Sequence, residues 1–143
     1  MKPQPQKATV QVTRKFSVSA ERVFGAWLDP KTVGKWLFAT PTGKMSKVKI
    51  DARIGGSYLI VECREGADVE HIGEYLEIER PRRLVFTLKV PKYSQEITKV
   101  TVEIRALESS CELTLTHEGV LADYIASTTS GWNMILDQLS TTL

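Results

Sequence analysis

The chain has 143 residues, enough for one domain with a hydrophobic core that needs neither disulfides nor metal ions to fold. Its 42% apolar content is ordinary for a globular protein, and the longest unbroken aliphatic and aromatic run, residues 58–61, is far too short to cross a bilayer. The formal net charge of +2, with acidic and basic residues interspersed, argues against a surface for nucleic acid.

Residues 1–8 are expected to be a disordered polar tail. They contain no apolar segment of the kind that a secretory signal needs, so a cytoplasmic location is the expectation. In that reducing compartment Cys63 and Cys111 are expected to pack as small apolar side chains rather than to form a disulfide.

The first elements in chain order are one strand and two helices. Apolar and polar residues alternate over residues 9–16, as they do in a strand with one buried face. Ser19 is a typical helix cap, and residues 20–28 carry apolar side chains at helical spacing. Pro30 can open a second, short helix, which Gly34 weakens.

Six antiparallel strands joined by short loops come after these helices. The evidence is alternation of apolar and polar residues, interrupted by residues that favour turns. The strands are predicted over residues 48–52, 58–63, 71–78, 84–90, 100–105 and 112–117.

The period changes in the last part of the chain, where a long helix is predicted. One stripe recurs there at spacings of three and four: Leu121, Ile125, Thr128, Trp132, Ile135, Leu139 and Leu143. Residues 127–131 have low helix propensity, so either packing holds them in the helix or they mark a kink. Gly131 suggests that the helix backbone comes close to the sheet or leaves space beside a cavity; the alternative is simple drift in a loop-like kink.

These elements predict one α+β domain over residues 1–143. A curved antiparallel sheet wraps around the long C-terminal helix, and two short helices follow the first strand. The reason is that a sheet with one apolar face can bury it here only against the last helix.

Several local patterns recur in order along residues 9–143. They are Ala20-Glu21-Arg22-Val23-Phe24 with Asp29-Pro30 and Lys35-Trp36, Gly55-Gly56 before Tyr58, Gly73-Glu74-Tyr75-Leu76-Glu77-Ile78, Pro81-Arg82-Arg83-Leu84-Val85-Phe86-Thr87, and Gly131-Trp132 with Leu136 and Leu139. Together they resemble the START-like (SRPBCC) superfamily and, within it, the family of homologues of the activator of heat-shock protein 90 ATPase.

The resemblance implies a helix-grip fold with a cavity between the sheet and the last helix. In relatives such a cavity binds lipids, sterols, polyketides or plant hormones, and some members related to polyketide cyclases are enzymes. The resemblance also implies a contact with a chaperone. The further N-terminal domain through which eukaryotic co-chaperones make that contact is not in this chain, which argues against chaperone activation.

The expected ligand-binding residues are large or polar side chains on faces predicted to point inward: Trp36, Tyr58, Tyr75, Phe86, His117, Trp132 and Met134. For the large apolar members of this set, Trp36, Phe86, Trp132 and Met134, packing in the core is expected first and contact with a ligand second. His117 is also the one weak candidate for catalysis, as a proton acceptor. The alternative is a histidine satisfied by a backbone carbonyl or by water. His71 is expected to be exposed, whereas Glu62 and Glu77 either contact the ligand or lie on the solvated face of a strand.

Motifs for metals and nucleotides are missing from the sequence. It contains no HExxH, paired CxxC or three-histidine arrangement, so no metal site is expected. It also contains neither GxGxxG nor a phosphate-binding loop, so no nucleotide cofactor is expected.

Three functions stay open on these residues. The first expectation is a binding protein for a hydrophobic small molecule, without a cofactor, as a monomer or weak homodimer. A cyclase-like or hydrolase-like enzyme would use His117 with a tyrosine or carboxylate across the same cavity, and its lone candidates make it the weaker expectation. A chaperone-associated interaction module depends on the family resemblance alone.

Overall fold

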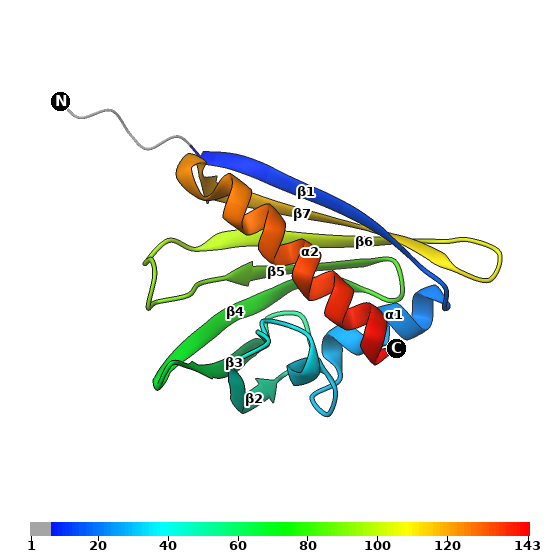
Figure 1. The fold of residues 1–143 in the computed structure, drawn as a ribbon. Coiled ribbons are helices and arrows are strands. Elements are labelled where there is room, and N and C mark those ends of the chain that lie inside the picture. The colour runs from blue at the N-terminus through cyan, green and yellow to red at the C-terminus, as the bar shows by residue number, and fades with distance from the viewer. Residues whose placement is uncertain (1–6) are drawn as a thin grey trace.

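The computed structural model of the chain describes residues 7–143, and its elements follow the predicted order (Figure 1). In chain order they are strand β1 (Lys7–Phe16), helix α1 (Ala20–Leu28), 3-10 turn η1 (Val33–Lys35), strands β2 (Lys44–Ile50), β3 (Ser57–Arg64), β4 (Ala67–Glu79), β5 (Arg83–Leu88), β6 (Thr98–Ala106) and β7 (Cys111–Leu121), 3-10 turn η2 (Ala122–Tyr124) and helix α2 (Ile125–Thr142). Lys7 and Ala8, predicted as tail, already belong to β1 and pair with β7. The rest of the predicted tail, residues 1–6, lies outside the described residues.

The seven strands form one antiparallel sheet in the order β1-β7-β6-β5-β4-β3-β2. The sheet is curved, α2 crosses its concave face, and α1 lies at one end (Figure 1). Alternate residues of the strands point to this face: Val12 pairs with Leu115 and Val10 with His117, and all four side chains are buried. The predicted α+β helix-grip architecture is therefore confirmed.

Helix α1 begins where its cap residue predicts. The Ser19 hydroxyl oxygen accepts a hydrogen bond from the Arg22 backbone N–H at 3.2 Å, which satisfies one of the free donors of the first turn. The buried side chains follow the helical period: Ala20, Val23, Phe24 and Trp27. The second predicted helix forms only the single turn η1, in keeping with the low helix propensity of Gly34 at its centre.

Strand β4 bends closely over β5 at Gly73. A Cβ atom at this position would lie 1.8 Å from the carbonyl oxygen of Thr87, so only glycine allows this approach. The Tyr58 hydroxyl donates a hydrogen bond to the same oxygen at 2.6 Å. The strand register shifts between Tyr75 and Glu77, just beyond the bend, and such a bulge adds curvature to a sheet.

Aromatic rings fill the space between α2 and the middle of the sheet. The ring centroid of Trp27 lies 4.7 Å from that of Trp36, 6.1 Å from that of Phe86 and 6.4 Å from that of Trp132. None of the four side chains is more than 3% exposed. The predicted burial of Trp36, Phe86 and Trp132 is confirmed.

Helix α2 packs on the sheet only along its C-terminal half. Its buried residues are Trp132, Ile135, Leu136 and Leu139. Polar contacts hold the same half: Arg14 of β1 pairs with Asp137, and the Gln138 amide donates to two backbone carbonyls of residues 36–39 at 3.0 and 2.9 Å. Within residues 7–143, no helix is long and apolar enough to span a membrane.

The first two turns of α2, residues 125–131, have no buried side chain. The predicted apolar stripe is therefore only half correct, since Ile125 is 37% exposed. The helix still runs unbroken through residues 127–131, and the hydroxyls of Ser127 and Thr129 donate back to carbonyls of the preceding turn. A Cβ atom at Gly131 would meet no atom within 4 Å, so of the two predicted alternatives the structure has the open space and not the close approach to the sheet.

Candidate functional site

Between α2 and the middle of the sheet, where the sequence predicts a cavity, buried aromatic side chains fill the space. A void of about 10 Å³, with room for one water molecule at most, lies between Trp27 of α1, Leu37 and strands β3 to β5. Three predicted ligand-binding residues, Tyr58, Tyr75 and Phe86, line this void. Burial raises the pKa of both tyrosine hydroxyls, so both side chains are neutral.

Three further predicted residues lie in or beside the packed core. Trp36 is fully buried, Trp132 is 3% exposed, and Met134 is half-buried on α2. The indole N–H groups of Trp27 and Trp36 have no hydrogen-bond partner among the described residues. Trp36, Trp132 and Met134 border neither this void nor the larger hollows at the two ends of the molecule, and their role in ligand binding stays a prediction.

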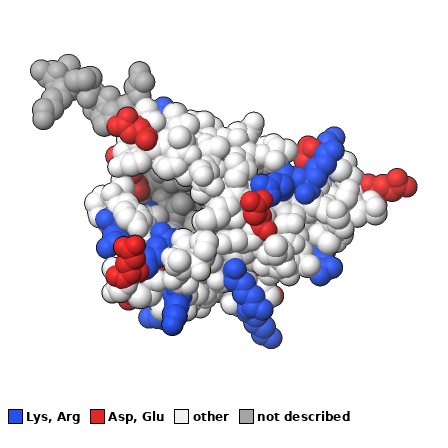
Figure 2. Space-filling model, in the orientation of Figure 1, with Lys and Arg blue, Asp and Glu red and all other residues white. Residues whose placement is uncertain are grey.

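A larger hollow lies beneath the unpacked first half of α2. We call it the α2 groove; its volume is about 360 Å³, and Figure 2 shows it as an opening at the end of the molecule away from α1. Its lining residues come from the ends of β5, β6 and β7, the loop 89–97, η2 and α2: Leu88, Val90, Tyr93, Ser94, Glu96, Thr98, His117, Gly119, Val120, Leu121, Tyr124, Ser127 and Thr128. His117 is the one predicted site residue among them.

His117 forms part of a chain of hydrogen bonds at the inner end of the α2 groove. The Trp132 indole N–H donates to His117 Nδ1 at 3.0 Å. Because an indole N–H is only a donor, Nδ1 accepts and the ring hydrogen is on Nε2. Nε2 then donates to the Thr98 hydroxyl at 2.7 Å, and that hydroxyl donates to the carbonyl of Leu88 at 3.1 Å.

These hydrogen bonds determine whether His117 is available as a general base. Both ring nitrogens are engaged, and burial lowers the pKa of His117 to about 4, so the ring is neutral near pH 7. A general base needs a free lone pair within reach of its substrate. His117 offers none in this arrangement, and Tyr75, its predicted partner, lines the central void rather than the α2 groove. The predicted inward orientation of His117 is confirmed, but its partners are Trp132 and Thr98.

His71 and Glu62 differ from their predicted settings, because loop residues cover them. The sequence neighbours of His71 predict an exposed side chain, yet it is 5% exposed and stacks on the Phe38 ring at 4.3 Å. Burial lowers the pKa of His71 to about 4. Glu62 is 1% exposed; it accepts hydrogen bonds from the N–H and hydroxyl of Thr40 at 2.6 and 2.9 Å and pairs with Arg64. It thus fastens the loop before β2 and lies outside the α2 groove.

The same network explains an unusual backbone angle. Phe38 has φ of 60°, in the left-handed region that costs a bulky residue on the order of 1–3 kcal/mol. Arg64 donates to the carbonyl oxygen of Phe38 at 3.1 Å, and the stacking on His71 holds the ring. Gly43 completes the loop, since a Cβ atom there would lie 2.4 Å from the Glu62 carboxyl carbon.

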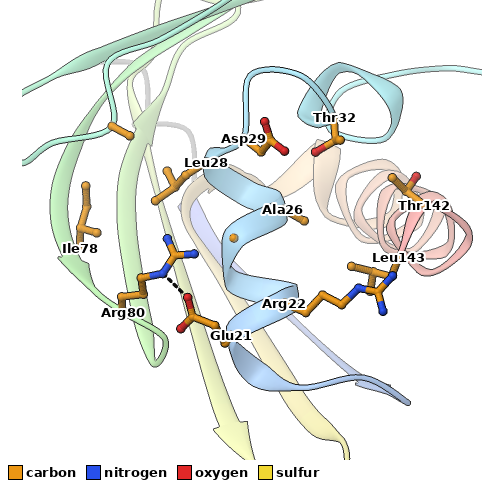
Figure 3. Close-up of a pocket in the computed structure, with 12 residues that line it drawn as sticks. Glu21, Arg22, Ala26, Leu28, Asp29, Thr32, Ile78, Arg80, Thr142 and Leu143 are labelled. Carbon is orange, nitrogen blue, oxygen red and sulfur yellow. Dashed lines mark hydrogen bonds and ion pairs between the residues drawn. The ribbon is translucent and has the colours of Figure 1, made fainter.

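A second hollow, with a volume of about 700 Å³, lies at the opposite end of the molecule around α1. Figure 3 shows that its two arginines do not converge: Arg80 reaches toward one side of α1, and Arg22 points away toward Leu143. Arg80 is already paired with Glu21, and its guanidinium lies 5.4 Å from the centroid of the Phe24 ring. Charges of both signs line this hollow, and it is less suited to an apolar ligand than the α2 groove.

Sequence reasoning missed most of the α2 groove. Tyr93 and Tyr124 line it while being 63% and 55% exposed. A signal exists, since both are aromatic residues within otherwise polar connecting segments, but no periodicity links them.

Glu77, the other carboxylate with an open role, pairs with Arg83 at 3.3 Å and borders neither hollow. Residues 7–143 also contain no cluster of three or more side chains suited to a metal ion.

A curved antiparallel sheet around one long helix, with hollows at its ends, defines a protein of the helix-grip class. The model of the family "Activator of Hsp90 ATPase homolog 1-like protein" matches residues 17–143. The chain therefore belongs to this family, within the START-like (SRPBCC) superfamily, and the predicted resemblance is confirmed. No curated protein sequence matches the chain.

Solved structures agree with this fold. CV1439 from Chromobacterium violaceum is 28% identical, with a TM-score of 0.85, over 93% of this chain and 94% of that one. Mll3558 from Rhizobium loti is 22% identical, with a TM-score of 0.83, over 99% and 100% of the two chains. A protein from Rhizobium leguminosarum is 19% identical, with a TM-score of 0.85, over 97% and 95%. The two matches below 25% identity concern the fold alone.

Proposed function

We propose that this protein binds an apolar small molecule in the α2 groove. The supporting observation is that the first half of α2 stands over the apolar ends of three strands without packing on them. The volume of about 360 Å³ is in the range of small-molecule sites, and the apolar side chains of Leu88, Val90 and Val120 are among the lining residues. The family fold is consistent with ligand binding.

The hydrophobic effect predicts how the affinity should depend on the length of an apolar ligand. Each methylene group that leaves water contributes about 0.8 kcal/mol, which is about a fourfold change in the dissociation constant. Neutral alkyl probes of increasing length should therefore bind with steadily increasing affinity until the α2 groove is full. Longer probes should then gain nothing.

A fluorescence titration with N-phenyl-1-naphthylamine, which is neutral and apolar, tests the site. The wild-type protein should bind this probe saturably. Thr128→Trp places a bulky ring in the α2 groove and should weaken binding at least about tenfold, the equivalent of roughly 1.4 kcal/mol. Ser130→Trp, an exposed position on the same helix, is the matched control and should bind as the wild type does. No saturable binding, or an equal loss in both variants, would contradict the proposal.

A further inference from the structure

The lining of the α2 groove, as far as the structure describes it, has one acidic side chain and no basic one. Among its lining residues Glu96 is the only charged side chain, and no lysine or arginine of residues 7–143 lines it. His117 adds no positive charge, because its ring is neutral and both nitrogens are engaged. The carboxylate or phosphate of an anionic ligand would therefore meet no lysine or arginine among the described lining residues of the groove.

The partner of Glu96 lies outside the groove. Lys7 Nζ is 3.0 Å from Glu96 Oε2, but Lys7 is not among the lining residues. The two side chains are 50% and 48% exposed, and an ion pair so exposed contributes only about 0–1 kcal/mol. A cation that enters the groove can therefore replace Lys7 or share the Glu96 carboxylate with it.

Two aromatic rings add to the same preference. Tyr93, in the loop between β5 and β6, and Tyr124, in η2, both line the groove and stay largely exposed. The face of an aromatic ring attracts ammonium groups, by about 0.5–1 kcal/mol at exposed sites. A carboxylate and two aromatic rings thus line the same groove.

We propose that the α2 groove selects amphiphiles with a positively charged head, such as alkylamines or quaternary alkylammonium ions, over neutral and anionic compounds with the same apolar body. This inference rests on the proposed function, because the apolar body occupies the floor of the groove. It adds the chemical class of the ligand and assigns Glu96 as the residue that determines specificity.

Isothermal titration with three probes of equal chain length tests the inference: decyltrimethylammonium, decanol and decanoate, at neutral pH, low salt and concentrations below micelle formation. The ammonium probe should bind about 3–10-fold more tightly than decanol, from one exposed ion pair plus one ring contact, and decanoate should bind most weakly. Lys7→Ala should increase the preference for the ammonium probe, because it removes the competing cation.

Glu96→Gln should lower the ratio of ammonium to decanol affinity, leaving only the part that the ring contact supplies. Glu118→Gln is the matched control: this carboxylate has similar exposure and a lysine partner, Lys99, but lies outside the groove, so the ratio should persist. Equal binding of the three probes, or a ratio of ammonium to decanol affinity that is unchanged in Glu96→Gln, overturns the inference and leaves the proposed function standing. Failure of all three probes to bind overturns both.

Discussion

His117 and His71 are both neutral and buried, but for different reasons. His117 links α2 to β6 through its hydrogen bonds with Trp132 and Thr98. His71 is covered by the Phe38 ring, and its Nδ1 lies 3.2 Å from the carbonyl oxygen of Ile60. In each case protonation would place a charge in a buried setting, and for His117 it would also remove the acceptor of the Trp132 N–H. In the arrangement that the structure shows, both rings therefore contribute to packing and hydrogen bonding in the core.

The stability of the protein should consequently fall on mild acidification. The pKa of each histidine is about 4 in the folded state, below the ordinary value of 6.5, so between pH 6.5 and 4 the unfolded chain binds more protons. Each histidine should lower the free energy of unfolding by up to about 1.4 kcal/mol per pH unit in this window. Above pH 6.5 their contribution is constant.

Urea unfolding at several pH values measures this slope. His117→Gln removes one of the two titrating groups, so its slope between pH 6.5 and 4 should be smaller than that of the wild type by up to about 1.4 kcal/mol per pH unit. The difference between the two slopes leaves out the contribution of the carboxylates, because they titrate in both proteins. An unchanged slope would show that His117 is already solvated in the folded state.

At the scale of elements, α2 combines two different segments. Residues 132–139 are fixed by the apolar core, by Arg14 and by Gln138. Residues 125–131 have poor helix propensity and no buried side chain, so their helical conformation depends on the packed segment 132–139. The segment that covers the α2 groove therefore gains no stability from buried side chains of its own.

Two glycine substitutions should change the stability in opposite directions, one in this segment and one in the tightly packed sheet. Gly131→Ala should raise the free energy of unfolding by about 0.5–1 kcal/mol, because alanine favours the helix and its Cβ meets open space. Gly73→Ala should destabilise strongly, because its Cβ would lie 1.8 Å from the Thr87 carbonyl oxygen. Denaturant midpoints of the two variants give both values. A destabilising Gly131→Ala would mean that α2 lies closer to the sheet than the structure has it.

At the scale of the whole molecule, the sequence could predict the fold because the signals are local. Alternation in strands, the Ser19 cap and the stripe of α2 each depend on neighbouring residues. The site depends on distances that no local pattern records. The stripe shows which side of α2 is apolar, but not that Ile125 stays 37% exposed. His71 is buried by Phe38, a loop residue with an uncommon backbone angle, and neither could be read from the alternation of β4.

The central claim is that a ligand binds at the end of the sheet, under the first half of α2, while the aromatic core stays closed. Nuclear Overhauser contacts between bound N-phenyl-1-naphthylamine and the labelled protein test it most directly. We predict contacts with the methyl groups of Leu88 and Val120, and unchanged indole N–H signals for Trp27 and Trp36. Contacts of the probe with Trp27 or Tyr58 would contradict the claim, because they would show that the ligand enters the core.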